Sequence, residues 1–481
     1  MKYLKDILHN IVVTKLKGCT NKSISKISLN TNSVSKNCLF VAIKGNNLDG
    51  HSYINDAIKL GASAILCENI PNEINENITY VVVEDTRESL AVCSSNFFNK
   101  PSQKIKLIGV TGTNGKTSIA TLLYNLFTSL NIKSGLISTI ENIVDQEHFD
   151  SKLTTPDPFE INSLLNMMVE RNCKFCFMEV SSHGISQKRV NGLNFDCGVF
   201  SNLSRDHLDY HKDFNDYVLT KKKFFDSLSE NSISIVNKDD KFHELMINDC
   251  VSKKIFYGLN NKSDYLGKVI SSTLNGIKMK INEFFIDTKI AGQFNVYNLL
   301  AVFSVAKELT NRSIHLHIKN LEKVPGRFNI INGSSGKIGI IDYAHSPDAL
   351  VKIFDTIKSL RKKNQKIISV LGCGGNRDIG KRPIMGKIAY LNSDTSIFTS
   401  DNPRYEKIEK IIFDMKSDIK EDSNRKLLCI NDRYEAILQA SSIAISDDII
   451  LILGKGHEDY QEIEGKRKPF NDLKLLTKIL K

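Results

Sequence analysis

One stretch, KLIGVTGTNGKTS at residues 106–118, constrains the fold of this chain more than any other. Its apolar start, residues 106–110, predicts a buried strand, and the apolar residues that follow Ser118 recur at helical spacing. The glycines between them therefore form a strand-to-helix turn. Backbone N–H groups at the N-terminus of a helix are unpaired and partly positive, so this turn is suited to bind phosphate.

The side chains of this turn also suit a phosphorylated ligand. Lys116 can reach the terminal phosphates of a nucleotide, and the Thr117 hydroxyl can ligate Mg²⁺. The spacing departs from the strict G-x-x-x-x-G-K-[ST] pattern, because Val110 stands where the pattern has its first glycine. An ordinary glycine-rich turn is the alternative. We favour the phosphate site because glycine, lysine and threonine share the one context that the mechanism needs.

The length of 481 residues predicts about three domains, at roughly 100–200 residues each. Turn-rich segments at residues 99–103 and 324–328 divide the chain into 1–98, 99–325 and 326–481. Strands alternate with helical patterns in the second and third parts, which predicts mainly parallel sheets. The predicted fold is therefore α/β: a smaller N-terminal α/β domain, a central P-loop ATPase-type parallel sheet and a Rossmann-like C-terminal domain.

The net charge of +11 is compatible with an anionic partner. The basic residues, including the runs at 221–223 and 361–363, are spread along the chain without interleaved aromatic residues, so we expect anionic small molecules and no nucleic acid. A general bias toward lysine would make the charge uninformative, and the two interpretations have equal weight.

The cysteines and the N-terminus predict the compartment. The ten cysteines are scattered, and the C-x-x-C at Cys173 and Cys176 lacks the second pair that a zinc site needs. The first residues, MKYLKD, lack the apolar core of a signal peptide, and no apolar run approaches the roughly 18 residues of a membrane span. We expect a soluble cytoplasmic monomer with reduced thiols and no membrane insertion.

Polar residues follow the predicted strands beside the phosphate-binding turn. Glu179 ends one strand, and Asp206, His207 and Asp209 follow another. Ligands gather at the carboxyl ends of parallel strands, so some of these side chains can share Mg²⁺ with Thr117. Each alone is more often a surface charge or a helix cap, and a histidine is a less usual magnesium ligand than a carboxylate. From spacing alone, the lysines at 221–223 are a solvated helix face.

The third domain supplies further polar groups. Arg327 and Asp342 can reach the phosphate and ribose of a nucleotide across an interdomain cleft, with an ordinary salt bridge as an equal alternative. The GCGG sequence at 372–375 is a weak candidate for an anion-binding nest. Asp401 and Arg404 flank a turn stiffened by Pro403. Such a pair can bind an amino-acid zwitterion, with arginine on the carboxylate and aspartate on the ammonium.

Ten motifs together resemble the Mur ligases of peptidoglycan synthesis, and the resemblance covers essentially the full length. They are GTNGKTS at 112–118, TTPDP at 154–158, EVSSHGISQKRV at 179–190, NLSRDHLDYH at 202–211, GQFNVYN at 292–298, PGRF at 325–328, DYAHSPDAL at 342–350, GCGGNRDIGKRP at 372–383, DNPR at 401–404 and GKGHEDYQ at 454–461. Within the family, the chain is similar to the ligases that extend UDP-N-acetylmuramoyl-L-alanyl-D-glutamate.

The resemblance implies an ATP-dependent ligase whose first domain binds the uridine nucleotide, whose second binds ATP, and whose third binds the incoming amino acid. In this family the glutamyl carboxylate of the UDP substrate attacks the γ-phosphate of ATP. The resulting acyl phosphate is then attacked by the amino group of the third substrate. Charge stabilisation dominates such chemistry, so Lys116 and Mg²⁺ would account for much of the barrier reduction.

The resemblance also assigns residues by position. For magnesium it implies Thr117, Glu179, His207 and a carbamylated Lys221, with Lys222 and Lys223 as competitors for the modification; the catalytic set is Lys116, Glu179, His207 and Lys221. For ATP it implies Gly112, Thr113, Asn114, Gly115, Lys116, Thr117, Ser118, Asn295, Asn298, Arg327, Asp342 and His345. For the UDP substrate it implies Thr31, Thr154, Thr155, Ser181, Gln187 and Arg189. For diaminopimelate it implies Arg377, Asp401, Asn402, Pro403, Arg404, Gly454 and Glu458.

The DNPR sequence resembles that of the meso-diaminopimelate-adding members, and lysine-adding relatives lack its arginine. The physical argument agrees, because diaminopimelate has one carboxylate more than lysine, and arginine would repel the bare ammonium end of lysine. One departure concerns the uridine site. Asn30, Thr31 and Asn32 stand where the family often has Asp-Ser-Arg. The Thr31 hydroxyl can replace the serine, but the carboxylate and guanidinium are missing.

Four other interpretations remain open. The nearest is a lysine-adding ligase of the same family. A related amide ligase such as folylpolyglutamate synthase would share the ATP core without a uridine-binding first domain or DNPR. A non-catalytic nucleotide-binding regulator is disfavoured because Lys116, Glu179, His207 and Lys221 are all present, and a nucleic-acid-binding protein would show affinity for DNA at physiological salt.

Overall fold

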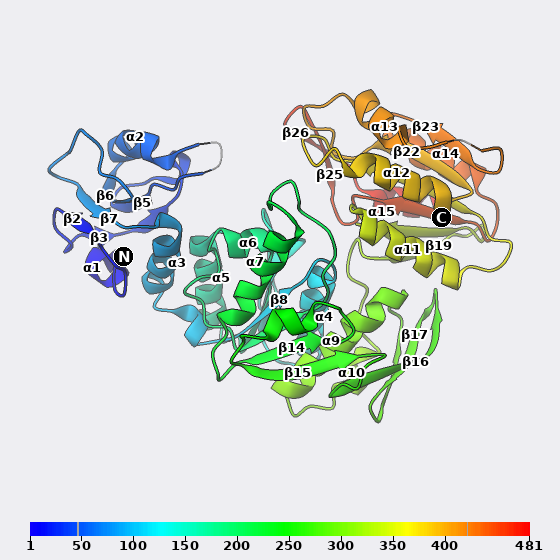
Figure 1. Ribbon diagram of the computed structural model, residues 1–481, viewed down its shortest axis with the longest axis horizontal. Helices are drawn as coiled ribbons and strands as arrows, with labels where there is room; N and C mark the ends of the chain where they lie inside the picture. The colour runs from blue at the N-terminus through cyan, green and yellow to red at the C-terminus, as the bar shows by residue number, and fades with distance from the viewer. Residues whose placement is uncertain (46–47, 421) are drawn as a thin grey trace.

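The computed structural model describes residues 1–45, 48–420 and 422–481. Three large sheets follow one another along the chain, each with its own helices. Figure 1 shows the first and third units at opposite ends of the long axis, with the central unit between them. The α/β class predicted from the sequence is confirmed.

The N-terminal unit is a five-stranded sheet. In spatial order its strands are β2 (Lys15–Lys17), β7 (Thr79–Val82), β6 (Ala62–Cys67), β5 (Cys38–Val41) and β4 (Lys26–Ser28). They pair in parallel, except β2 with β7. The unit also contains β1 (Lys2–Tyr3), β3 (Ser23–Ile24), α1 (Leu4–Ile7), α2 (Ile54–Lys59) and α3 (Thr86–Phe97). Phe97 and Phe98 meet the ring of Phe159 in the central unit at 5.6 and 5.1 Å, so an apolar contact joins the two units.

The central unit has an eleven-stranded sheet. Its order is β11 (Glu147–Asp150), β10 (Glu141–Val144), β9 (Ser134–Ile137), β12 (Phe175–Glu179), β8 (Lys106–Thr111), β13 (Cys197–Phe200), β14 (Ile233–Asn237), β15 (Lys253–Gly258), β16 (Tyr265–Thr273), β17 (Gly276–Ile281) and β18 (Phe284–Thr288). The strands from β9 to β16 run parallel, as the alternation of strands and helices predicts. The two edges are antiparallel additions that we did not predict, because hairpin strands need no helix between them.

Helices cover both faces of this sheet. They are α4 (Lys116–Ser129), α5 (Pro158–Glu170), α6 (Ser182–Ser186), α7 (Phe214–Asp226), α8 (His243–Ile247), α9 (Gln293–Leu309) and α10 (His315–Ile318). One apolar core contains residues of α4 and α9, and the other contains residues of α5 and α7. The parallel strands β12, β8 and β13 are neighbours, so their carboxyl ends meet at one edge.

The C-terminal unit is a six-stranded sheet. Its order is β19 (Asn329–Asn332), β20 (Ile338–Asp342), β24 (Ile449–Leu453), β21 (Ile367–Cys373), β22 (Thr395–Ser400) and β23 (Lys426–Cys429), with β19 alone antiparallel to its neighbour. Its helices are α11 (Pro347–Leu360), α12 (Lys381–Asn392), α13 (Ile408–Lys416), α14 (Arg433–Ile443) and α15 (Asp472–Leu480), and β25 (Tyr460–Ile463) forms a hairpin with β26 (Lys466–Pro469). Across the described residues, we find no helix of the length and apolar character needed to cross a membrane.

Candidate active site

A cavity of about 1970 Å³ lies between the central and C-terminal units. Its lining comes from the turn after β8, the loops after β12 and β13, and the loops after β20, β21, β22 and β24. Residues 113–118 of the phosphate turn line its central-unit end, and Asp401, Asn402 and Arg404 of the DNPR turn line its C-terminal end. Two parallel sheets therefore direct the carboxyl ends of their strands into the same space.

Glycine is required twice in the phosphate turn. A Cβ on Gly112 (φ 146°) would lie 2.0 Å from Ser201 Oγ, and one on Gly115 (φ 89°) would lie 2.6 Å from Asn298 Oδ1. Any larger residue would strain the backbone and push these loops apart. Lys116 is the first residue of α4, and its Nζ donates to the Gly112 carbonyl at 2.9 Å. The turn thus has the compact form that leaves helix N–H groups open to phosphate.

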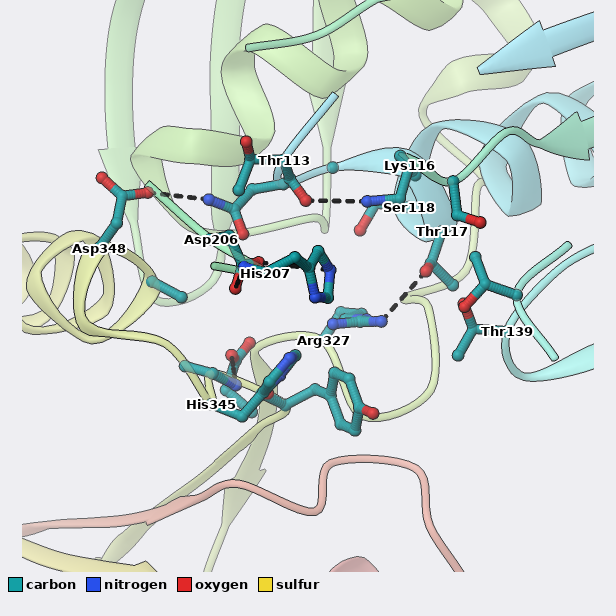
Figure 2. A pocket seen from close by; sticks show the side chains of 18 of the residues that line it. Thr113, Lys116, Thr117, Ser118, Thr139, Asp206, His207, Arg327, His345 and Asp348 are labelled. Atoms are coloured by element: carbon teal, nitrogen blue, oxygen red, sulfur yellow. Dashed lines mark hydrogen bonds and ion pairs between the residues drawn. The ribbon is translucent and has the colours of Figure 1, made fainter. Parts of the chain in front are cut away.

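The hydroxyl of Thr117 in α4 is hydrogen-bonded to Glu179 at the end of β12 and to Arg327 before β19. It donates to Glu179 Oε2 at 3.0 Å and accepts from Arg327 Nη2 at 3.0 Å. Figure 2 shows the guanidinium of Arg327 directed at Thr117. Glu179 is fully buried at the end of β12, and its Oε1 accepts from the Thr139 backbone N–H at 2.7 Å. This carboxylate is therefore held with both oxygens beside the phosphate turn.

The lysine run of α7 separates into three environments. Lys221 is buried, and its Nζ donates to the Gly112 carbonyl at 2.9 Å. Lys222 pairs with two aspartates, each at 2.6 Å, and Lys223 is exposed. Burial, reinforced by the nearby Lys116 ammonium, lowers the pKa of Lys221 well below that of an ordinary lysine. The expectation of a solvated helix face therefore holds for Lys223 alone of the three. It fails for Lys221, which the helix turns toward the phosphate turn, and for Lys222, which is buried against two aspartates.

His207 lies in the loop that follows β13. Its backbone has φ 55°, in the left-handed region, and its ring lies edge-on to the ring of His183 at 4.9 Å. Burial lowers the pKa of His207, with the Asp206 carboxylate acting in the opposite direction. The imidazole is therefore neutral near pH 7 and keeps a lone pair for a ligand. Asp209 lines the same part of the cavity.

The C-terminal unit contributes a second wall at this end. The guanidinium carbon of Arg327 lies 4.5 Å from the centroid of the Tyr343 ring, and the His345 ring lies 4.6 Å from the same centroid. Asp342 ends β20 and accepts from two backbone N–H groups at 2.8 Å. Burial raises the pKa of Asp342 to about 6, against the opposing effect of Arg327. Cationic and aromatic groups of the third unit thus face the phosphate turn.

The opposite end of the cavity carries the groups predicted to bind an amino acid. Arg404 adopts φ 52°, its Nη1 donates to the Gly375 carbonyl at 2.8 Å, and its Nε lies 3.3 Å from Glu462 Oε2. The lining of this end includes Arg377, Asp401, Asn402, Arg404, Gly454 and Glu458, whereas Pro403 lies outside it. Two guanidinium groups and two carboxylates therefore line this end of the cavity, which suits a ligand with separate charged ends.

Comparison with known proteins agrees with this geometry. The family models described as Mur ligase family, catalytic domain; Mur ligase middle domain; and Mur ligase, glutamate ligase domain match residues 23–103, 110–306 and 326–456. A curated relative from Bacteroides fragilis, UDP-N-acetylmuramoyl-L-alanyl-D-glutamate--2,6-diaminopimelate ligase, is 45% identical over 99% of both chains. The chain belongs to the Mur ligase family. A second relative of the same name, from Parabacteroides distasonis, is 43% identical over 99% of this chain and 98% of its own.

Solved Mur ligases share the architecture. A structure of UDP-N-acetylmuramoyl-L-alanyl-D-glutamate--2,6-diaminopimelate ligase is 30% identical, covers 100% of this chain and 98% of its own, and superposes with a TM-score of 0.69. MurF ligase from Thermotoga maritima, solved in complex with ADP, has a TM-score of 0.64 at 18% identity over 90% of this chain and 94% of its own, which shows the shared fold.

The residues predicted for the UDP substrate lie in three places in this Mur ligase. Thr154, Thr155, Ser181 and Arg189 line the cavity next to Glu179. Gln187 lies just behind them, where its Oε1 accepts from Arg189 Nη2 at 2.6 Å. Thr31 belongs to a short 3₁₀ helix of the N-terminal unit and does not line the cavity.

The two asparagines predicted for ATP also divide. Asn298 lines the main cavity, and Asn295 lines a small adjoining pocket together with Arg327. Asn298 Nδ2 donates to Asn295 Oδ1 at 2.9 Å, so the two side chains act as one unit.

Asp348 of this Mur ligase is a site residue that was not predicted from the sequence. Its Oδ2 accepts from Asn114 Nδ2 in the phosphate turn and from Ser204 Oγ in the loop after β13, each at 2.8 Å. Asp348 stands in the first turn of α11, so it joins the C-terminal unit to the nucleotide end of the central unit. Asp348 lies within the DYAHSPDAL motif. A carboxylate in the first turn of a helix is usually explained by its favourable interaction with the helix dipole, so the sequence alone did not indicate these partners.

Proposed function

We propose that this Mur ligase adds meso-2,6-diaminopimelate to UDP-N-acetylmuramoyl-L-alanyl-D-glutamate in peptidoglycan biosynthesis, with release of ADP and phosphate. The observation that carries the proposal is the shared cavity, which has the phosphate turn at one end and Arg377 and Arg404 at the other. Relatives that carry this activity in their name are 43–45% identical over 99% of the chain.

The cavity accounts for both steps of an amide ligation. ATP phosphates bind at the N-terminus of α4, where Lys116 and Arg327 can offset charge that builds up on the transferred phosphoryl group. The glutamyl carboxylate of the UDP substrate attacks the γ-phosphorus, and ADP leaves. The amino group of diaminopimelate, having lost a proton, attacks the carbonyl of the acyl phosphate. The tetrahedral intermediate then collapses to the amide and inorganic phosphate.

Magnesium ions fit the donor set beside the phosphate turn. The Thr117 hydroxyl and the buried Glu179 carboxylate, 3.0 Å apart, are the oxygen donors that this hard cation prefers. His207 and a carbamate on Lys221 would hold a second ion. The depressed pKa of Lys221 leaves an uncharged amine that can add CO₂ with release of a proton. Bound magnesium would supply charge neutralisation of the phosphates.

We assign the three units to the three substrates. Residues 1–98 would bind the uridine nucleotide, 99–325 ATP and the glutamyl end, and 326–481 the incoming amino acid. Lys188 Nζ bridges to Asp85 and Glu88 at 2.8 and 2.7 Å, which ties the N-terminal unit to the loop that carries Gln187 and Arg189. Thr31 is the group that we assign to the uridine side of that unit. We further expect the enzyme to act as a cytoplasmic monomer.

The amino-acid end favours diaminopimelate over lysine. Its distal carboxylate would accept from Arg404, whose guanidinium donates to the Gly375 carbonyl and pairs with the partly exposed Glu462 carboxylate. Lysine would bring an ammonium without a carboxylate and leave Arg404 without an anionic partner from the ligand, which costs affinity.

The test is phosphate release from ATP and Mg²⁺ with UDP-N-acetylmuramoyl-L-alanyl-D-glutamate, run in parallel with meso-diaminopimelate and L-lysine. Release that depends on diaminopimelate alone supports the proposal. Preference for lysine would refute the specificity and keep the ligase. No release with either amino acid would refute the activity.

A further inference from the structure

The GKGHE turn, residues 454–458, contains a charged group to which the proposed function gives no role. Lys455 follows β24, and its side chain is 0% exposed. Its Nζ donates to Glu458 Oε2 at 2.7 Å and to Asn402 Oδ1 at 3.1 Å, and lies 5.5 Å from the centroid of the Tyr460 ring. Burying an ammonium is unfavourable unless it is paired. Both partners here are residues that we assign to the amino-acid substrate.

The orientation of the Asn402 amide follows from this contact. Its Oδ1 accepts from Lys455 Nζ and also from the backbone N–H of Glu462 at 2.9 Å. Two donors on one atom identify it as the oxygen, so the amide nitrogen points the other way. That nitrogen donates to Glu458 Oε2 at 2.9 Å. Lys455 therefore determines the direction in which Asn402 presents its donor.

The protein contacts the Glu458 carboxylate through one of its two oxygens. Oε2 accepts from both Lys455 and Asn402, whereas within residues 1–45, 48–420 and 422–481 no hydrogen bond reaches Oε1. Glu458 lines the amino-acid end of the cavity. One oxygen is thus fixed by the protein and the other is left for the ammonium of a ligand.

The charge of Glu458 also depends on its neighbours. Burial and the Asp401 carboxylate raise the pKa of Glu458, and Lys455 and Asn402 lower it. The other ionisable groups that face it are Arg433 on α14, Tyr343 after β20 and Tyr460 on β25. Arg433 is already engaged by Asp472 at 2.7 Å, which leaves Lys455 as the ammonium in direct contact with Glu458.

We propose that Lys455 is a positioning residue for the amino-acid substrate: it holds Asn402 and Glu458 in the orientation and charge state in which they bind the zwitterionic end of diaminopimelate. This inference rests on the proposed function. It adds a residue that binds no substrate itself and acts through two that do.

The test compares Lys455→Met, which keeps the volume and removes the charge, with Lys337→Met as a control. Lys337 is half-buried in the same unit, donates to the Ser441 carbonyl at 2.9 Å, and does not line the cavity. At pH 7 we expect kcat/KM for diaminopimelate to fall about tenfold or more in Lys455→Met, through KM, with KM for ATP unchanged. The control should match the parent.

The pH dependence of kcat/KM for diaminopimelate distinguishes a positioning role of Lys455 from a purely structural one. Without Lys455 the pKa of Glu458 rises, so the ionised form that binds an ammonium is reached only at higher pH. The acid limb of kcat/KM for diaminopimelate should therefore move upward in Lys455→Met, and much of the loss should disappear near pH 9. A loss of the same size at every pH would overturn the proposal.

A double variant keeps the proposal falsifiable if Lys455→Met folds poorly. Lys455→Met/Glu458→Gln removes both charges and keeps both shapes, which a buried site tolerates better than one unpaired charge. If Lys455 acts through Glu458 and Asn402, the loss for diaminopimelate in the double variant should be smaller than the sum of the losses in Lys455→Met and Glu458→Gln. Additive losses would contradict the proposal. A parent enzyme inactive with diaminopimelate would refute the proposed function, whereas an active parent with an unaffected Lys455→Met would refute this inference alone.

Discussion

The two ends of the cavity are built in different ways. The phosphate turn is local: Gly112, Gly115 and Lys116 lie within five residues, and Lys116 bonds to a carbonyl four residues before it. The amino-acid end draws on separate loops, since Arg404 contacts Gly375 and Glu462 across 29 and 58 residues of sequence. A locally encoded site tolerates little change in its own residues. An assembled site depends as well on the residues that hold its loops together.

The largest effect is expected at the local site. Lys116→Ala removes the ammonium that we assign to the transferred phosphoryl group, so phosphate release with diaminopimelate should fall by roughly 10²–10³-fold. Lys106→Ala, an exposed lysine of the strand that leads into the same turn, should leave turnover unchanged. Turnover of Lys116→Ala within a few-fold of the parent would show that the phosphate turn does not bind the reacting nucleotide.

Substitutions at Lys221 and Lys223 test whether a buried and an exposed lysine of one helix contribute differently to turnover. Lys221→Met should lower turnover about 10²-fold with any amino acid that the enzyme accepts, because the amine that would carry the magnesium-binding carbamate is lost, and added bicarbonate should not restore it. Lys223→Met, on the exposed face of α7, should behave as the parent. In the parent, removal of CO₂ should lower activity and bicarbonate should restore it. Equal effects of the two substitutions would contradict the assignment of Lys221.

Arg404 tests the assembled site. Hydrogen bonds to charged groups contribute about 1.5–3 kcal/mol, so Arg404→Ala should reduce kcat/KM for diaminopimelate by roughly 10- to 100-fold. KM for ATP should not change, because Arg404 lies at the other end of the cavity. Arg425→Ala, which removes an ion pair with Asp422 on the surface of the same unit, is the matched control. Use of diaminopimelate at the parental rate by Arg404→Ala would refute its role.

The smallest effect is expected at the junction of the two units. Asp348→Ala removes the 2.8 Å bonds to Asn114 and Ser204, each of which contributes about 1 kcal/mol. It also removes an ion pair with the partly exposed Lys352, which contributes little. We expect KM for ATP to rise by a few-fold to about 30-fold, with KM for diaminopimelate nearly constant. A parallel rise in both constants would indicate that Asp348 acts on the whole cavity and not on its nucleotide end.

The contrast between the two ends explains which parts of the site could be predicted from the sequence. The strand, the glycines and the helix of the phosphate turn were predicted from spacing alone, because their geometry is fixed within one short segment. Spacing alone did not show which of the three lysines at 221–223 in α7 are buried. The three residues have the same chemistry, and only packing against the phosphate turn buries Lys221 while Lys223 stays in solvent. The resemblance to the Mur ligases, not periodicity, indicated Lys221.

By itself, the sequence determined the α/β class, the phosphate turn and the motifs that mark the Mur ligase family, because each depends on residue types at short, fixed separations. Tertiary structure decided the rest. It extended the parallel sheet with antiparallel edges, set Asp348 on the phosphate turn and enclosed Lys455 between Asn402 and Glu458. The side-chain contacts join residues that are 3 to 234 positions apart. A charged group that is buried on folding must be paired, and a short sequence pattern does not show which groups become buried together.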